Sequence, residues 1–112
     1  MKHTYTLLQL DDENINVLAD HKLFESWQML NKTAGFNIHQ YKKVYEGEIE
    51  SDPIQGNDIL GALESLFKTF NIDHPDDYRG RSLSVSDVVV LDDVKYYCDS
   101  YGWVNIETDK KV

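Results

Sequence analysis

The sequence predicts an α+β domain in which two helices pack on a mostly antiparallel sheet, in the order β-α-β-α-β-β-β, with a C-terminal three-stranded meander. Three observations support this prediction: a helical apolar stripe within residues 57–71, a period-two pattern over residues 38–49, and short β-rich runs after residue 87. A chain of 112 residues has room for one hydrophobic core. We therefore expect a single domain over residues 1–107 and a disordered tail at residues 108–112.

The first strand is expected over residues 4–10, where both faces are rich in apolar side chains and an acidic turn follows. The first helix is expected over residues 21–33. Asp20 would cap its start and Gly35 would end it in the left-handed conformation. The apolar stripe that predicts this helix consists of Leu23, Phe24, Trp27 and Leu30.

The second strand is expected from residue 38 to residue 49, and Asp52-Pro53 ends it. The alternation would place Tyr41, Lys43, Tyr45, Gly47 and Ile49 on one face. The opposite face would carry three carboxylates, so it is either solvated or in contact with something basic. Its members are Lys42, Val44, Glu46, Glu48 and Glu50.

The second helix has the clearest pattern in the chain. Asn57 or Asp58 would cap its start, and Lys68 suits its last turn. Asn71 is expected to end it in the left-handed conformation, before His74-Pro75 forbids continuation. Six large apolar residues recur at helical spacing and make this helix a principal core element: Ile59, Leu60, Leu63, Leu66, Phe67 and Phe70.

The C-terminal third is predicted to be β structure. A buried strand over residues 88–91 turns at Asp92-Asp93 into a return strand over residues 94–98. A second turn at residues 100–102 leads to the last strand at residues 103–106. The stretch 78–91 joins a polar, Gly-containing turn to the strongest β signal in the chain, and the rest of the fold is organised around it.

The chain has 20 acidic and 11 basic residues, which gives a net charge of −9. Such a charge repels phosphate backbones, so direct nucleic-acid binding is disfavoured, and it favours docking onto a basic groove of a protein. The single cysteine, Cys98, can form no internal disulfide, and no spacing indicates zinc. We expect a cytoplasmic protein without cofactor, metal or membrane association, present as a monomer or weak homodimer.

The run of Ser82, Ser84, Ser86 and Asp87 is rich in nucleophilic side chains, as a catalytic site would be. A serine hydrolase needs a histidine base and a strained Gly-x-Ser-x-Gly elbow, and neither is visible. Short polar side chains usually bond local amides where a chain turns into a strand, so a structural role is favoured. His74, Asp76 and Asp77 are metal ligands by type but lack an established spacing. We therefore expect no catalytic residues and no enzymatic activity.

Arg79 and Arg81 flank Gly80 and form the only compact arginine pair. They have the chemistry to grip a phosphate or carboxylate, but internal pairing with Asp76, Asp77 or Asp87 is the favoured interpretation. An aromatic cluster surrounds the last turn, and alternation predicts that one or two of its members face solvent as binding anchors. It consists of Tyr96, Tyr97, Tyr101 and Trp103.

Four segments occur in an order that resembles a known family. They are VYEGEI at 44–49, LESLFKTFN at 63–71, PDDYRGRSLSVSDVV at 75–89 and YYCDSYGW at 96–103. Together they resemble the YodL-like domain family of Gram-positive bacteria, over roughly residues 38–106. The resemblance implies a domain common on plasmids, conjugative elements and prophages, often beside antirestriction modules. It brings no catalytic residues, and leaves open whether the run 81–87 is architecture or a docking surface.

The sequence thus leads to the hypothesis of a non-enzymatic, acidic protein-binding module of a mobile element. It would inhibit a host defence enzyme, of the restriction or CRISPR type, by occupying a basic nucleic-acid groove. The alternative is an accessory interaction module in element maintenance or host-process control, without a nuclease target. The candidate partner-binding residues are Glu46, Glu48, Glu50, Asp76, Asp77, Tyr78, Arg79, Arg81 and Trp103.

Overall fold

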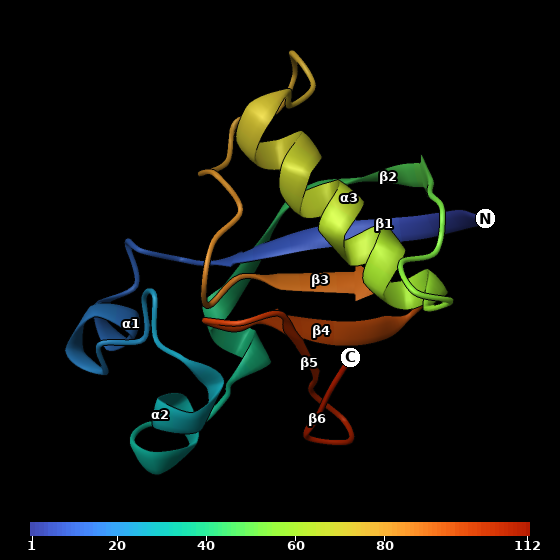
Figure 1. Cartoon of the computed structure of the whole chain (residues 1–112). Coiled ribbons are helices and arrows are strands. Elements are labelled where there is room, and N and C mark those ends of the chain that lie inside the picture. The colour runs from blue at the N-terminus through green and yellow to red at the C-terminus, as the bar shows by residue number, and fades with distance from the viewer.

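A computed structural model describes all residues 1–112, and its centre is one six-stranded antiparallel sheet (Figure 1). The strands lie in the order β2-β1-β3-β4-β5-β6, so β2 and β6 form the two edges. The strands are β1 (Lys2–Leu10), β2 (Tyr41–Glu50), β3 (Val88–Leu91), β4 (Val94–Cys98), β5 (Trp103–Asn105) and β6 (Lys110–Lys111). The helices are α1 (Ile15–Ala19), α2 (Trp27–Lys32), a 3-10 helix (Ile38–Gln40) and α3 (Asp58–Ile72).

The predicted α+β class and antiparallel sheet are confirmed, but the element order differs. Three α-helices form instead of two, and the C-terminal meander has four strands because residues 108–112 contain β6. Lys110 and Lys111 pair with Asn105 and Val104 of β5, and Val112 packs against the core. This segment had been expected to form a disordered tail.

The sheet is covered on both faces, but unequally. Helix α3 crosses one face of the strands, whereas α1 and α2 lie together at one end of the molecule (Figure 1). The larger core cluster joins α3 to its sheet face through residues such as Leu7, Leu66 and Phe70. A smaller cluster on the opposite face consists of Trp27, Leu30, Val88, Tyr97 and Val104. The buried strand predicted at residues 88–91 is confirmed as β3, and β1 contributes Tyr5 and Leu7 to the larger cluster and Leu8 to the smaller one.

The first predicted helix is wrong in its extent. His21 and Phe24 have positive φ angles of 54° and 64°, which interrupts any helix over residues 21–33. The chain forms α1 before this point and restarts as α2, capped by Ser26, whose side chain accepts from Met29 N–H. Asp20 is therefore the residue after α1 and not an N-cap. Gly35 does adopt the left-handed conformation, with φ of 77°.

A register shift in β2 corrects the predicted alternation. Leu7 pairs with Tyr45 but Leu8 pairs with Lys43, so Val44 is an extra residue. Such a bulge moves the residues before it to the other face. Tyr45 accordingly packs in the α3 cluster, whereas Tyr41 packs in the α2 cluster, although the sequence pattern placed both on one face.

Helix α3 follows its prediction closely, except that it runs to Ile72 and Lys68 therefore does not lie in its last turn. The side chain of Asn57 caps it by accepting from Leu60 N–H at 3.0 Å. The helix continues through Asn71 to Ile72, so Asn71 is helical and does not end it, contrary to expectation. Gly61 is required here because a Cβ at this position would lie 2.1 Å from the backbone oxygen of Asp52.

The turn at Asp92-Asp93 is confirmed, with φ of 49° and 69°, which is the left-handed pair of a type I′ hairpin turn. No helix in the chain combines the length and the apolar character that crossing a membrane requires.

Candidate functional site

The run that resembles a catalytic motif belongs to a structural network in which Ser86 and Asp87 are buried. The side-chain amide of Gln9 on β1 donates to Arg81 O at 2.9 Å and to the Asp87 carboxylate at 3.1 Å, while its oxygen accepts from Arg81 N–H at 3.0 Å. The Tyr78 hydroxyl also donates to Arg81 O, at 2.5 Å. One glutamine side chain of the sheet thus holds the loop of residues 78–87 against α3's face of the sheet.

Ser84, Ser86 and Asp87 turn the loop into β3, as the structural interpretation predicted. The Asp87 carboxylate accepts from Ser84 N–H at 2.9 Å. Ser86 has a positive φ of 84°, and its hydroxyl accepts from Phe24 N–H at 3.1 Å. Its carbonyl accepts from the Tyr41 hydroxyl at 2.6 Å. Ser86 therefore links the α1–α2 connection, β2 and β3, and is only 1% exposed.

The interior around Asp87 strongly disfavours charge. Burial raises the pKa of the Asp87 carboxyl to about 7, although hydrogen bonds from Ser84 and Gln9 and the charge of Arg81 oppose the shift. Burial also raises the pKa of the Cys98 thiol to about 12, with a further contribution from Asp87. A thiol with such a raised pKa is a poor nucleophile at neutral pH.

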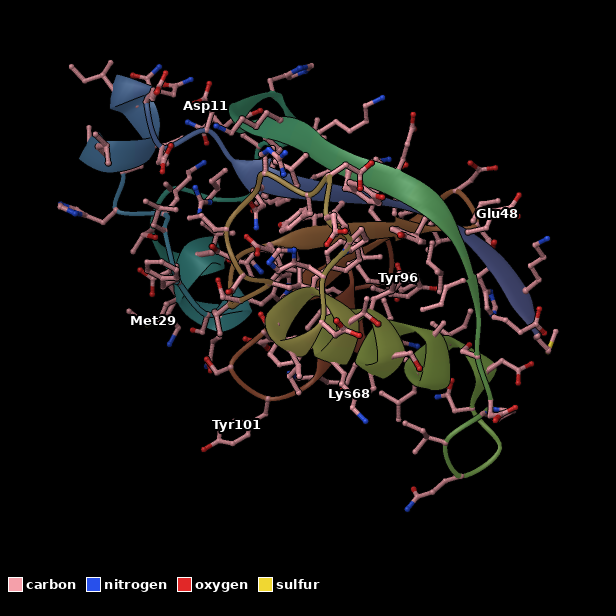
Figure 2. All side chains as sticks on the ribbon, turned by 90° about the horizontal axis from the view of Figure 1, so that it is seen from above. Asp11, Met29, Glu48, Lys68, Tyr96 and Tyr101 are labelled. Carbon is pink, nitrogen blue, oxygen red and sulfur yellow. The ribbon has the colours of Figure 1, made fainter.

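Tyr78 and Trp103 do not form surface anchors, contrary to the sequence hypothesis. Their exposed fractions are 5% and 2%, and both belong to the α3 cluster. Tyr96 lies between the sheet and α3, whereas Tyr101 extends from its turn into solvent (Figure 2). Of the four aromatic residues that the sequence placed around the last turn, Tyr101 faces solvent, with 87% of its surface exposed.

The three carboxylates of β2 lie where the sequence placed them. Glu46, Glu48 and Glu50 pair across from Thr6, Thr4 and Lys2 of β1, on the face opposite α3. Figure 2 shows Glu48 at the outer side of β2. Helix α2 does not reach this end of the sheet, and a hollow of about 320 Å³ opens there. It is lined by Thr4, Tyr5, Thr6, Glu46, Gly47, Glu48, Val90 and Asp93.

Each carboxylate of this row also has a cationic partner. Glu46 lies 3.2 Å from Lys43, Glu48 lies 2.9 Å from Lys2, and Glu50 lies 3.3 Å from the N-terminal amine. All three pairs are exposed to solvent, so each contributes little to stability and exchanges readily for another cation.

Asp76 and Asp77 are exposed but lie away from that row. The Asp77 carboxylate accepts from the Tyr45 hydroxyl at 2.9 Å, and Tyr45 packs on the α3 face. The sheet therefore separates these two aspartates from Glu46 and Glu48. The structure divides the predicted acidic surface into two parts.

Arg79 and Arg81 are held within the chain, as predicted, but not by the carboxylates of Asp76, Asp77 or Asp87. Arg81 forms an ion pair with Asp12 at 2.9 Å, and Asp12 comes from the turn after β1. Arg79 donates to the backbone carbonyls of Asp76 and Tyr78, at 2.7 and 3.1 Å. Asp87 influences Arg81 only as a nearby charge.

His74 contacts its own neighbour, with its Nδ1 atom 3.0 Å from Pro75 O. No three His, Cys, Asp or Glu side chains come together in a group that could hold a metal ion. The cluster of His74, Asp76 and Asp77, weighed in the sequence as a metal site, thus has no ligand geometry.

Sequence reasoning missed two surface features. One is a groove of about 330 Å³ between α3 and the β4–β5 turn, lined by Phe67, Leu83, Val85 and Trp103 among others. The other is a hollow of about 440 Å³ where Lys42 and Lys43 of β2 meet Arg79 and Arg81. Both arise from segments far apart in the chain, so no local pattern could reveal them.

Comparison with known proteins gives the family but no function. No curated protein matches the chain, and no solved structure matches it. The sequence model of the YodL-like domain matches residues 4–108, nearly the whole chain. This protein is therefore a member of the YodL-like domain family.

Proposed function

We propose that this protein is a non-enzymatic binding module that presents the open, acidic end of its sheet to a basic surface of a partner protein. In the setting that the family resemblance implies, the partner is a host defence nuclease, and the module acts as a counter-defence inhibitor in its nucleic-acid groove.

The observation that carries this proposal is the uncovered end of the sheet beyond α2. Glu46 and Glu48 stand at a hollow that also includes the exposed Asp93. Strands hold these carboxylates on one side of the sheet, so their positions are set before binding. The net charge of −9 would accelerate encounter with a basic surface.

The burial of Ser86 and Asp87 supports the non-enzymatic part of the proposal. Ser86 and Asp87 are each only 1% exposed, and their oxygens already accept hydrogen bonds within the chain. A substrate carbonyl has no route to such a hydroxyl without unfolding of the loop.

The test is inhibition of DNA cleavage by restriction and CRISPR nucleases of a Gram-positive host, with the wild type and the double variant Glu46→Lys/Glu48→Lys. We expect the wild type to slow cleavage and the double variant to lose this effect. A matched control, Glu13→Lys/Asp20→Lys, reverses two exposed charges near α1 and should retain inhibition.

The association rate of the inhibited complex should fall steeply as ionic strength rises, because screening weakens steering by charge. An association rate that ignores ionic strength, or equal inhibition by both double variants, would contradict docking through this face.

One observation favours an accessory interaction module instead. The cationic partners of Glu46, Glu48 and Glu50 neutralise part of the negative charge of the row. The row therefore resembles a phosphate backbone less closely. Under this alternative the same face binds a protein that has no nucleic-acid role. Absence of any effect on host nucleases, together with unchanged folding of the chain, would favour it.

A further inference from the structure

A basic hollow on this acidic protein is the strongest feature that the proposed function does not use. Its lining includes Lys42 and Lys43 from β2 and Arg79 and Arg81 from the loop, which are four of the chain's eleven basic residues. The remaining lining residues are Gln9, Asp12, Val44 and Gly80, so Asp12 is the single carboxylate in the wall.

The fold brings these cations together through Gln9. Its backbone pairs with Lys42 across the β1–β2 ladder, while its side chain binds both the N–H and the carbonyl of Arg81. Gly80 stands between the two arginines, where a Cβ would lie 2.5 Å from the Tyr78 hydroxyl and 2.9 Å from Gln9 Oε1. The hollow therefore has a wall held by the core, which lowers the ordering penalty of binding.

Arg81 is positioned but not saturated. Its Nη1 bonds Asp12 at 2.9 Å and its Nη2 bonds Leu10 O at 3.2 Å, while its Nε has no partner although it is buried. Each terminal nitrogen carries two hydrogens, so each keeps one N–H for a further acceptor while the group is held in place.

The other three cations have weak or no acidic partners. Arg79 uses Nη1 for backbone carbonyls and forms no ion pair, which leaves its other donors free. Lys42 lies 3.8 Å from Asp11 and 4.0 Å from Asp12, beyond hydrogen-bond length. Lys43 forms an exposed pair with Glu46, at 3.2 Å.

The combination of two guanidinium groups and two ammonium groups matches a phosphate dianion. Arginine forks bind phosphate oxygens in pairs, and lysines add mobile charge. A long polyanion fits less well, because it would pass over Asp11, Glu46, Asp76 and Asp77, which border these cations in sequence or as ion-pair partners. Because salt screens charges beyond about 8 Å at physiological ionic strength, the positive potential of the hollow attracts only anions that come close to it.

We propose that this hollow is a binding site for the phosphate group of a small phosphorylated molecule, with Arg79, Arg81 and Lys42 as its principal donors. These three donors do not pair with the acidic docking face; Lys43 is the residue of the hollow that does, through Glu46.

The experiment is a titration of ¹⁵N-labelled protein with pyrophosphate, followed by NMR at constant ionic strength. We expect saturable shifts centred on the amides of Gly80, Arg81 and Lys42. The variant Arg79→Gln/Lys42→Gln should bind about tenfold or more weakly, because each change removes a charged donor to phosphate. Its control, Lys32→Gln/Lys68→Gln, removes two exposed cations on α2 and α3 and should bind as the wild type does.

Three outcomes would overturn the proposal: no shift at millimolar pyrophosphate, shifts spread over all lysines, or equal weakening in both double variants. A short single-stranded DNA oligonucleotide is the second probe. If it binds more tightly than pyrophosphate and with steep salt dependence, the source of the phosphate is a nucleic acid and the small-molecule assignment is wrong. A negative result in the phosphate titration does not change the outcome expected for nuclease inhibition by the Glu46→Lys/Glu48→Lys variant.

Discussion

The loop of residues 78–87 and the carboxylate row of β2 are both polar, and both attract functional interpretations from sequence, yet the fold treats them in opposite ways. In the loop, Asp87 is 1% exposed and its oxygen accepts two hydrogen bonds. In the row, Glu46 and Glu48 are exposed and make only surface ion pairs. Residue type is therefore a poor guide to role, and the number of internal partners is a better one.

The loop teaches that a run of serines with an aspartate can be architecture. Gln9, some seventy residues earlier in the chain, supplies the donor and acceptor that satisfy it. The row has no such partner from the core, so its carboxylates remain free to exchange their cations for those of another molecule.

The largest expected effect comes from removing the buried carboxyl. Asp87→Ala leaves the Ser84 amide without its acceptor and removes one bond of Gln9, so we expect a loss of about 2–3 kcal/mol in the free energy of unfolding. Urea unfolding at pH 5 measures it. Asp76→Ala, at an exposed position in the same loop region, should change stability by less than about 0.5 kcal/mol. Equal effects of the two would erase the contrast between loop and surface.

Gly80→Ala tests, by a steric change, whether the loop of residues 78–87 is tightly packed. Its Cβ would lie 2.5 Å from the Tyr78 hydroxyl, so the Tyr78–Gln9–Arg81 contacts must shift. We expect a loss of about 1–3 kcal/mol, which is typical of overpacking. Gly35→Ala is an informative reference, because its Cβ meets no atom within 4 Å and only the positive φ of 77° resists it. A smaller loss for Gly80→Ala than for Gly35→Ala would mean that the loop is loosely packed.

The pH dependence of stability tests the burial of Asp87 directly. Burial raises the pKa of Asp87 in the folded chain to about 7, from an ordinary value of 3.8. Between these two pH values the folded chain keeps a proton that the unfolded chain has released. The resulting stability is fully present below the unfolded pKa and is lost as pH rises to about 7. Asp87→Asn should flatten this decline by at most about 1.4 kcal/mol per pH unit. Identical slopes for the variant and the wild type would show that Asp87 titrates normally.

The smallest effect on stability is expected for the row. Glu46→Gln/Glu48→Gln removes two exposed ion pairs, so the free energy of unfolding should change by less than about 0.5 kcal/mol. Thermal unfolding measures this change, with Glu13→Gln/Glu107→Gln as the charge-matched control. A loss comparable to that of Asp87→Ala would make the row structural and remove the basis of the docking proposal.

Much of the fold could be predicted from local patterns. Helix α3 was placed within about a residue at each end, because its apolar spacing, its Asn57 cap and Pro75 all agree. The first helix was predicted to begin too early, because the apolar stripe includes Leu23 and Phe24 although His21 and Phe24 adopt left-handed conformations. Phe24 is held by Ser86, which a local pattern cannot report.

The candidate site divides in the same way. The exposure of Glu46, Glu48 and Glu50 follows from period-two alternation, which the sequence carries in full. The burial of Tyr78 and Trp103 does not, because both positions are decided by how α3 lies over the sheet.

The sequence by itself determined the α+β class, the family, the acidic charge and the approximate positions of β1 to β5 and of α3, but not β6. These properties depend on composition and on neighbours within a few residues. Only the tertiary structure decided which polar residues are buried, where the bulge at Val44 reverses the faces of β2, and that Lys42 and Arg79 line one hollow. The reason is physical: burial and charge clustering depend on contacts between residues far apart in the chain, and a one-dimensional pattern records no such contact.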